Sequence, residues 1–211
     1  MTHFQLPRLY AIIDAACFAS TEELLRHAEE LVVGGCTLLQ YRNKIGNARV
    51  MLEQVRELRR QSRAGVPAPH VRLIMNDRAD LCLAANFDGV HVGQEDLSPE
   101  SVRRIIGTER WLGVSTHNPE QLREADLTSA DYLAIGPVFA TSSKDKPDPV
   151  VGLAGVRRAR DLTRKPLVAI GGITRANAAS VIDAGADSVA VISDLIRDPR
   201  KSAEEFFRIL R

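Results

Sequence analysis

The chain has 211 residues, of which 45% are hydrophobic and 26% are charged, and its formal net charge is +1. This composition fits one globular domain with a sizeable core, and the balanced charge argues against a nucleic-acid-binding protein or a polybasic membrane surface. Three scattered cysteines (Cys17, Cys36 and Cys82) form no CxxC pair, so we expect reduced thiols in a cytoplasm rather than disulfides or a zinc site. We also expect no signal peptide, and no apolar run approaches the roughly 20 residues of a membrane span.

Short apolar runs alternate with amphipathic stretches along the chain. Eight runs are predicted to be strands: Leu9–Ile13, Cys36–Tyr41, Arg72–Met75, Gly89–Val92, Trp111–Val114, Tyr132–Ile135, Leu167–Ile170 and Ser188–Ile192. Between and after them, helices are predicted from Thr21 as cap to Val33, over Ala48–Arg63, after Asp77, after Ser98-Pro99-Glu100, after Asn118-Pro119-Glu120, over Gly155–Leu162, over Arg175–Ala184 with Thr174 as cap, and over Ser202–Leu210.

Eight strands, each followed by a helix, predict a single-domain (β/α)8 TIM barrel that spans residues 1–211. The alternative is an open, doubly wound sheet. That fold usually carries a glycine fingerprint after its first strand, and Asp14-Ala15-Ala16-Cys17 is not one. The long polar segment 141–150 is a candidate active-site loop.

Polar residues stand where the predicted strands end, which is the edge where parallel α/β folds bind ligands. Asp77 and Asp96 follow neighbouring strands and would lie side by side, as a pair suited to Mg²⁺. Each also has a simpler explanation, since Asp77 could cap the next helix and Asp96 could precede a turn.

Two further groups of residues suit anions. In Gln40-Tyr41-Arg42-Asn43-Lys44, the two cations Arg42 and Lys44 could hold an anionic group, although a solvated rim is the alternative. Another group comprises Thr141, Ser142, Ser143 and Lys144, the backbone at Gly171-Gly172, and Ser193. The hydroxyls, the ammonium and the predicted helix start of this group together predict a phosphate site. For residues 141–144, a polar disordered loop is the alternative.

The predicted strand Trp111–Val114 is followed by Ser115 and His117. The Ser115 hydroxyl could bind substrate, and His117 could carry a proton or simply precede the Asn118 cap. His91 lies within a strand and is interpreted as a hydrogen-bonded histidine of the barrel interior. The sequence shows no Gly-x-Ser-x-Gly elbow. Residue patterns therefore predict one reactant with a magnesium-bound diphosphate and another with a phosphate, but they do not identify the organic parts.

The whole set of strand-end motifs resembles the thiamine phosphate synthase family. The motifs are Gln40-Tyr41-Arg42-Asn43-Lys44, Asn76-Asp77-Arg78, Gly93-Gln94-Glu95-Asp96, Gly113-Val114-Ser115-Thr116-His117, Gly136-Pro137-Val138-Phe139, Gly171-Gly172-Ile173 and Val191-Ile192-Ser193. The resemblance implies a (β/α)8 barrel that joins a pyrimidine diphosphate to a thiazole phosphate and releases pyrophosphate by a dissociative route. It also suggests a homodimer.

The resemblance assigns roles to individual residues. The metal Mg²⁺ would be bound by Asp77 and Asp96. The pyrimidine diphosphate would be held by Gln40, Tyr41, Arg42, Asn43, Lys44, Asn76, Ser115 and Lys144, of which Arg42, Lys44, Ser115 and Lys144 are the candidate catalytic residues. The thiazole phosphate would be held by Thr141, Ser142, Ser143, Gly172, Ile192 and Ser193. The cations would neutralise charge on the leaving pyrophosphate, and no covalent nucleophile is needed.

Two departures from the family pattern concern loop geometry. Ala140-Thr141-Ser142-Ser143-Lys144 stands where Pro-Thr-x-Thr-Lys is common, and Asn43 stands where an acid is common. Two rival hypotheses remain. A thiazole tautomerase on the same barrel would use His117 as proton carrier, but such relatives tend to lose the acid at Asp77. A phosphate-binding sensor would bind without turnover, and the retained Asp77/Asp96 pair argues against it.

Overall fold

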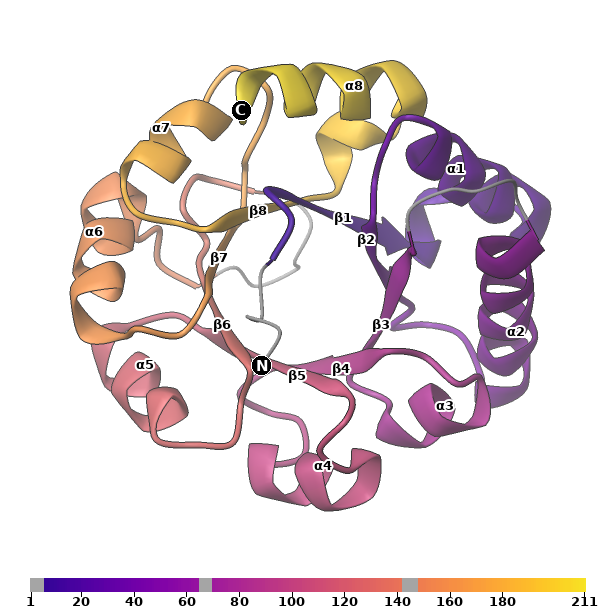
Figure 1. Cartoon of the computed structure of the whole chain (residues 1–211), viewed down its shortest axis with the longest axis horizontal. Coiled ribbons are helices and arrows are strands. Elements are labelled where there is room, and N and C mark those ends of the chain that lie inside the picture. The colour runs from indigo at the N-terminus through magenta and orange to yellow at the C-terminus, as the bar shows by residue number, and fades with distance from the viewer. Residues whose placement is uncertain (1–5, 65–69, 142–147) are drawn as a thin grey trace.

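The protein forms a closed barrel of parallel strands surrounded by helices (Figure 1). The structure is a computed structural model, and it describes residues 6–64, 70–141 and 148–211. The strands pair in chain order, and β8 closes the barrel against β1. Their bounds are β1 Leu9–Asp14, β2 Leu38–Arg42, β3 Arg72–Asn76, β4 Gly89–Val92, β5 Trp111–Thr116, β6 Tyr132–Ile135, β7 Leu167–Ile170 and β8 Ser188–Val191. The predicted (β/α)8 fold is confirmed.

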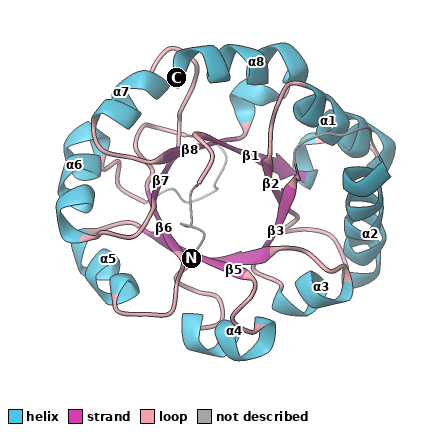
Figure 2. Ribbon diagram, in the orientation of Figure 1, coloured by secondary structure: helices cyan, strands magenta, loops and turns pink. Residues whose placement is uncertain are grey.

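The helices form the outer layer, as the cyan ring of Figure 2 shows. Their bounds are α1 Thr21–Val33, α2 Ala48–Ala64, α3 Ala79–Ala84, α4 Pro99–Ile106, α5 Pro119–Asp126, α6 Gly152–Leu162, α7 Ala178–Asp183 and α8 Pro199–Ile209, with short 3-10 helices η1 Ala15–Cys17 and η2 Ser193–Leu195. None of the helices in the described part of the chain is long and apolar enough to cross a membrane.

Four helix starts differ from the sequence prediction. Helix α6 begins at Gly152 rather than Gly155, and α8 begins at Pro199 rather than Ser202. Helix α1 is capped by Ser20 rather than Thr21, because the Ser20 hydroxyl accepts a hydrogen bond from the Glu23 N–H at 3.2 Å. Helix α7 begins at Ala178 rather than Arg175. The preceding residues form a turn instead, in which the Asn177 side chain accepts from the Thr174 N–H at 2.8 Å and donates to the Gly172 carbonyl at 3.0 Å. The caps at Ser98 and Asn118 are confirmed.

Strand alternation separates two cores. Residues that point outward pack under the helices in one large apolar layer, which includes Tyr41, Met75 and Val90. Residues that point inward fill the barrel with a smaller cluster, which includes Tyr10 and Tyr132. The inward set reaches the carboxyl ends of the strands, where it becomes polar, and this determines which strand-end side chains can meet a ligand.

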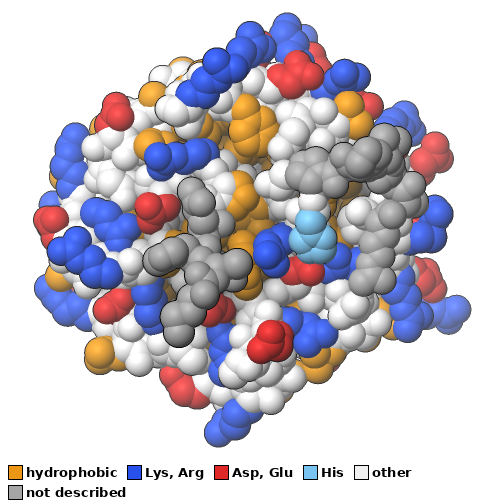
Figure 3. All heavy atoms as spheres, in the orientation of Figure 1, with side chains coloured by type: hydrophobic (Ala, Val, Ile, Leu, Met, Phe, Trp, Pro, Cys, Tyr) orange, Lys and Arg blue, Asp and Glu red, His pale blue; other side chains and the backbone are white. Residues whose placement is uncertain are grey.

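The amino ends of the strands are braced by a repeated contact. An aspartate stands directly before each of the strands β4, β6 and β8. Its carboxylate accepts a hydrogen bond from the first or second N–H of the neighbouring strand, β3, β5 or β7. The same carboxylate forms an ion pair with an arginine of α2, α4 or α6, respectively. The three sets are Arg59–Asp88–Leu73, Arg103–Asp131–Leu112 and Arg160–Asp187–Leu167, with arginine–aspartate distances of 2.8, 2.7 and 2.8 Å. We call these the amino-end clamps. Figure 3 looks onto this end, where positive and negative side chains are intermixed around the margin.

Candidate active site

A cluster of charged side chains lies at the carboxyl ends of β3 and β4. Asp77 follows β3 with φ of 61°, and its N–H donates to the carbonyl of His91 on β4 at 2.8 Å. This bond ties the left-handed backbone of Asp77 to the neighbouring strand. The Lys44 ammonium, from the loop after β2, lies 2.5 Å from the Asp77 carboxylate. Asp96 follows β4, and its carboxylate accepts the Gly93 N–H at 2.8 Å.

The electrostatics of this cluster favour a bound cation. Burial raises the pKa of Asp77, and the nearby Asp96 carboxylate raises it further, while the Lys44 ammonium lowers it. Two carboxylates that repel each other in a half-buried place are stabilised when a divalent cation lies between them. Among the described residues, no group of three or more His, Cys, Asp or Glu side chains is placed to hold a metal. A pair suits Mg²⁺ nonetheless, because this ion keeps waters and commonly uses one or two carboxylates together with substrate phosphates.

The residues of β2 and the loop after it separate into two environments. The Arg42 guanidinium forms an ion pair with Asp14 at the end of β1. Tyr41 points away from the barrel interior and donates its hydroxyl to Gln54 of α2 at 2.5 Å. Asn43 donates to the Tyr41 hydroxyl at 3.0 Å and accepts the Gly46 N–H at 2.7 Å, so it shapes the loop. Tyr41 and Asn43 therefore brace the segment that presents Arg42 and Lys44.

A chain of hydrogen bonds crosses the barrel interior beneath the rim. Gln40 of β2 donates through Nε2 to the Tyr10 hydroxyl at 2.7 Å, and the Tyr10 and Tyr132 hydroxyls lie 3.0 Å apart. The Tyr132 hydroxyl is 3.1 Å from Nδ1 of His91, whose Nε2 is 2.8 Å from the Ser115 hydroxyl. The interpretation of His91 as a hydrogen-bonded interior residue is confirmed. Sequence reasoning missed Tyr10, Tyr132 and Asp14 as neighbours of the site.

Ser115 and Asn76 stand at the rim above this chain. Both are inward-facing residues near the carboxyl ends of their strands, and both are partly exposed. The Ser115 carbonyl accepts the side-chain amide of Gln94 at 2.6 Å, which fixes the loop after β4 against β5. The structure thus gathers Gln40, Asn76, Asp77, Asp96 and Ser115 along one arc of the rim.

The predicted phosphate site after β6, β7 and β8 is described in part. Ser142, Ser143 and Lys144 lie outside the described residues. Gly172 has φ of 63°, and a Cβ there would lie 2.5 Å from the Ala140 carbonyl oxygen, so a side chain is excluded where this loop approaches the segment before Thr141. Ser193 is exposed and opens η2 beside the half-buried Ile192. Because α7 starts only at Ala178, the predicted helix start after Gly171-Gly172 is replaced by a turn.

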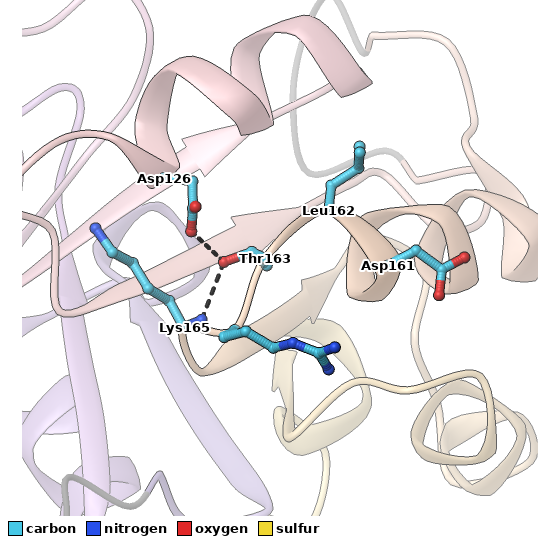
Figure 4. Close-up of a pocket in the computed structure, with 6 residues that line it drawn as sticks. Asp126, Asp161, Leu162, Thr163 and Lys165 are labelled. Atoms are coloured by element: carbon cyan, nitrogen blue, oxygen red, sulfur yellow. Dashed lines mark hydrogen bonds between the residues drawn. The ribbon is translucent and has the colours of Figure 1, made fainter.

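Two other features lie apart from this arc. His117 contacts the Gly136 carbonyl through Nδ1 at 2.6 Å, and its Nε2 lies 3.5 Å from the Asp148 carboxylate, so the ring connects the β5, β6 and β6–α6 segments. A hollow of about 500 Å³ is lined by Asp126, Asp161, Leu162, Thr163, Arg164 and Lys165 (Figure 4). Thr163–Lys165 directly precede β7, so this hollow lies at the opposite end from the carboxylate pair.

Several known proteins are similar to this chain in sequence and in fold. The sequence model of the family described as thiamine monophosphate synthase matches residues 9–195. Thiamine-phosphate synthase from Koribacter versatilis is 63% identical over 209 residues, which cover 98% of this chain and 97% of that relative. The Chloroflexus aurantiacus enzyme of the same name is 45% identical, over 90% of this chain and 85% of its own. A solved structure of thiamine phosphate pyrophosphorylase from Pyrococcus furiosus has a TM-score of 0.84 at 33% identity, covering 96% of this chain and 95% of that one.

Proposed function

The chain belongs to the thiamine monophosphate synthase family, and we propose that it joins 4-amino-5-hydroxymethyl-2-methylpyrimidine diphosphate to 4-methyl-5-(2-hydroxyethyl)thiazole phosphate, or its carboxylated form, with release of pyrophosphate. The protein is accordingly a transferase of thiamine biosynthesis that acts on small molecules. The observation that carries the details of the proposal is the cluster of Lys44, Asp77 and Asp96 on one side of the rim, where a diphosphate and its cation would be held together.

The diphosphate would bind over β2 to β5. Arg42 and Lys44 supply positive charge, and the Asn76 amide and the Ser115 hydroxyl supply hydrogen bonds to its oxygens. Arg42 is held by Asp14, which keeps the guanidinium near the rim before substrate arrives. Lys144 would add a further ammonium, on the sequence argument alone. Gln40 would contact the pyrimidine from the barrel floor, while Tyr41 and Asn43 would act by positioning the loop.

Asp77 and Asp96 would hold Mg²⁺, which when bound supplies neutralising charge to the diphosphate. The pair fits this ion because its own repulsion is relieved by a cation. Lys44 would then shift its ion pair from Asp77 toward the diphosphate oxygens, since its side chain is half exposed.

The reaction needs stabilised charge rather than a nucleophilic side chain. The bond between the pyrimidine methylene carbon and the diphosphate oxygen breaks, and its electron pair stays on that oxygen. Lys44, Arg42 and the Ser115 hydroxyl would stabilise this growing negative charge. The thiazole nitrogen then donates its lone pair to the methylene carbon, which forms the C–N bond of a thiazolium and, for the decarboxylated thiazole, completes the electron balance without a proton transfer. With the carboxylated form, CO₂ also leaves, and the ring carbon that keeps the electron pair of the broken C–C bond takes a proton from water.

The thiazole phosphate would bind over β6 to β8. The Thr141 and Ser193 side chains and the backbone at Gly172 would hold its phosphate, with Ser142 and Ser143 added on the sequence argument, and Ile192 would contact the ring. Gly172 supports this assignment because its missing side chain lets the loop after β7 pack directly against Phe139 and Ala140, next to Thr141. This arrangement would place the two reactants on facing sides of one barrel mouth.

The rival tautomerase and sensor hypotheses receive less support. A tautomerase would need His117 as a proton carrier, but the ring is already engaged by Gly136 and by Asp148. A sensor would not need a carboxylate pair beside a lysine. Thiamine phosphate formation from the two purified substrates, with and without Mg²⁺, tests all three: magnesium-dependent product is expected, whereas thiazole phosphate binding without product would contradict the proposal.

Two further expectations from the sequence stay proposals. We propose a cytoplasmic location, which the free cysteines Cys17, Cys36 and Cys82 support. A homodimer follows only from the family resemblance, and light scattering on the purified protein would test it.

A further inference from the structure

The buried chain of hydrogen bonds from Gln40 to Ser115 connects two residues that the proposed function places against the pyrimidine diphosphate. Its three middle members, Tyr10, Tyr132 and His91, are buried, with 1%, 0% and 8% of their surfaces exposed. A connected chain of hydroxyl and imidazole groups has a direction, because each member that accepts a hydrogen bond passes its own proton onward. The direction decides what Ser115 offers to a substrate.

The direction follows from the Gln40 end. The Gln40 amide can only donate through Nε2, so the Tyr10 oxygen accepts there at 2.7 Å. The Tyr10 proton then has the Tyr132 oxygen, 3.0 Å away, to donate to. The Tyr132 proton has the Nδ1 lone pair of His91 at 3.1 Å to donate to. A neutral imidazole that accepts at Nδ1 carries its proton on Nε2, and this atom lies 2.8 Å from the Ser115 oxygen.

We propose that Tyr10, Tyr132 and His91 are positioning residues that hold His91 in the Nε2–H tautomer, so that the Ser115 oxygen accepts from His91 and its hydroxyl proton is directed to the leaving diphosphate. This inference rests on the proposed function. Ser115 becomes a preoriented donor for the oxygen on which charge develops when the C–O bond breaks, and preoriented donors stabilise such charge most effectively.

If the hydrogen bonds of the chain ran in the opposite direction, Ser115 would have the opposite role toward the diphosphate. If the Gln40 amide were turned over, each bond in the chain would reverse, His91 would be the Nδ1–H tautomer, and Ser115 would donate to His91. Its oxygen would then present lone pairs to an anionic diphosphate, which is repulsive. The two tautomers therefore predict opposite roles for Ser115, and a measurement of the tautomer distinguishes them.

Gly113 supports a fixed arrangement. A Cβ at this position would lie 2.1 Å from Cζ of Tyr132 and 2.4 Å from Nδ1 of His91, so only glycine leaves room for these two side chains to meet. His91 and Tyr132 also pack ring against ring, with centroids 5.5 Å apart. Packing on this scale limits rotation of either ring, so the oxygen and nitrogen atoms of the chain stay within hydrogen-bond distance of one another.

The first test reads the tautomer directly. Long-range proton–nitrogen NMR on the whole protein with ¹⁵N-labelled histidine distinguishes protonated from unprotonated ring nitrogens, and His91→Gln assigns the signal. We expect a neutral His91 protonated at Nε2. Protonation at Nδ1, or at both nitrogens, would overturn the proposal. This readout needs no substrate, so it stays valid whether or not the protein makes thiamine phosphate.

The second test asks whether the chain acts through Ser115. In single-turnover measurements, Tyr132→Phe is expected to slow product formation about tenfold, the equivalent of one hydrogen bond. In a Ser115→Ala background the same change should have little further effect, because the group that the chain orients is gone. Equal effects in both backgrounds would show that Tyr132 matters only for packing and would contradict the proposal.

Variants at His91 provide a matched pair. Glutamine at position 91 keeps an amide donor close to the position of the His91 Nε2 atom. Leucine is of similar size but has no donor. His91→Gln should therefore retain several times the single-turnover rate of His91→Leu, with KM for the diphosphate changed less than kcat. Equal rates would contradict the proposal. If the wild-type protein itself forms no product while the NMR shows Nε2–H, the proposed function fails and the tautomer assignment stands.

Discussion

The Lys44 ammonium lies 2.5 Å from the Asp77 carboxylate, so the lysine that would neutralise a leaving diphosphate is held, before substrate binds, by a residue that would hold the metal. In the proposed reaction this one side chain would bind Asp77 first and the diphosphate afterwards. The pair also keeps the Asp77 pKa from rising further, because burial and Asp96 both act to raise it. The first two predictions concern these residues.

Replacing Asp77 with Asn should lower magnesium-dependent kcat at least about 100-fold, by analogy with the loss of one group that stabilises transition-state charge. Asn is the suitable change because Asp77 has φ of 61°, a conformation that Asn tolerates and Ala does not. Initial rates against Mg²⁺ concentration measure the effect. Asp80→Asn, at an exposed helix position, is the control and should match wild type. An unchanged rate in Asp77→Asn would remove Asp77 from the metal site.

Replacing Lys44 with Gln should reduce kcat by about 100-fold, because a charged donor to the leaving diphosphate is lost. Lys165→Gln is a matched control at the far end of the barrel, where the ammonium donates to the Thr128 carbonyl at 2.7 Å. Steady-state assays of both variants should show a loss of kcat only at position 44. Similar rates for Lys44→Gln and wild type would mean that other cations carry the stabilisation.

Gly113→Ala should both destabilise the fold and impair catalysis. Its Cβ would overlap Tyr132 and His91, and overpacking of this kind costs about 1–3 kcal/mol. Gly107→Ala is the contrast. Gly107 has φ of 74° and ψ of −173° with open space around it, so backbone strain should cost about 1–3 kcal/mol of stability while activity stays normal. Urea unfolding and kcat are measured for both. Full activity in Gly113→Ala would show that the His91–Tyr132 contact is dispensable.

His27 makes stability depend on pH. It is 5% exposed, its Nε2 has no hydrogen-bond partner among the described residues, and burial lowers its pKa from 6.5 to about 4. The unfolded chain therefore binds a proton below pH 6.5 that the folded protein rejects until about pH 4. Stability from the neutral imidazole is complete above the unfolded pKa and is lost as pH falls between these values, by up to about 3 kcal/mol.

His27→Phe should make this part of the stability profile less steep, while His91, whose pKa burial also lowers to about 4, keeps its own contribution. The ring packs beside Phe18, with centroids 4.9 Å apart, so an aromatic replacement keeps the contact and removes the titration. Urea unfolding from pH 7 to pH 4 measures the slope. His70→Gln, which removes an exposed imidazole, is the control and should keep most of the wild-type slope. An equally steep profile in His27→Phe would assign the pH dependence elsewhere.

Arg103→Leu should cost stability without reducing kcat. The guanidinium donates to the Gly107, Arg110 and Ser129 carbonyls and to Asp131, at 2.7 to 2.8 Å, and its loss leaves several acceptors unpaired. We expect the free energy of unfolding to fall by about 2–3 kcal/mol. Arg123→Leu, at an exposed helix pair, should cost less than about 1 kcal/mol. Denaturation midpoints and kcat are measured for both variants. A fall in kcat in Arg103→Leu would mean that the two ends of the barrel are coupled.

The barrel could be predicted from sequence because each strand and helix carries a local pattern. The starts of α1 and α7 differ from the prediction because a local side-chain hydrogen bond favours another backbone arrangement. Asn177 holds Thr174 in a turn, and Ser20 rather than Thr21 accepts a hydrogen bond from the Glu23 N–H. Such competition depends on side-chain geometry, which a residue pattern does not contain.

The site was predictable only in part for a related reason. Five successive residues from Gln40 were assigned together, although strand alternation directs Gln40 inward and Tyr41 outward. The meeting of Tyr10, Tyr132 and His91 depends on how strands are staggered around the closed barrel, and the sequence of any one strand says nothing of it. Asp77 directly follows β3 and Asp96 lies in the loop after β4, so the sequence alone predicts that both lie near the carboxyl ends of neighbouring strands.

The amino-end clamps recur once for every two strands from β3 to β8, and each consists of an arginine, an aspartate and one strand N–H. A contact that recurs at this interval marks consecutive segments of the chain as equivalent building units. Loops at the opposite end could then be exchanged between such units, or replaced outright, while the fixed base keeps the strands in register. The barrel is in this sense a platform for engineering new reactions, in which chemistry can be altered with little risk to folding.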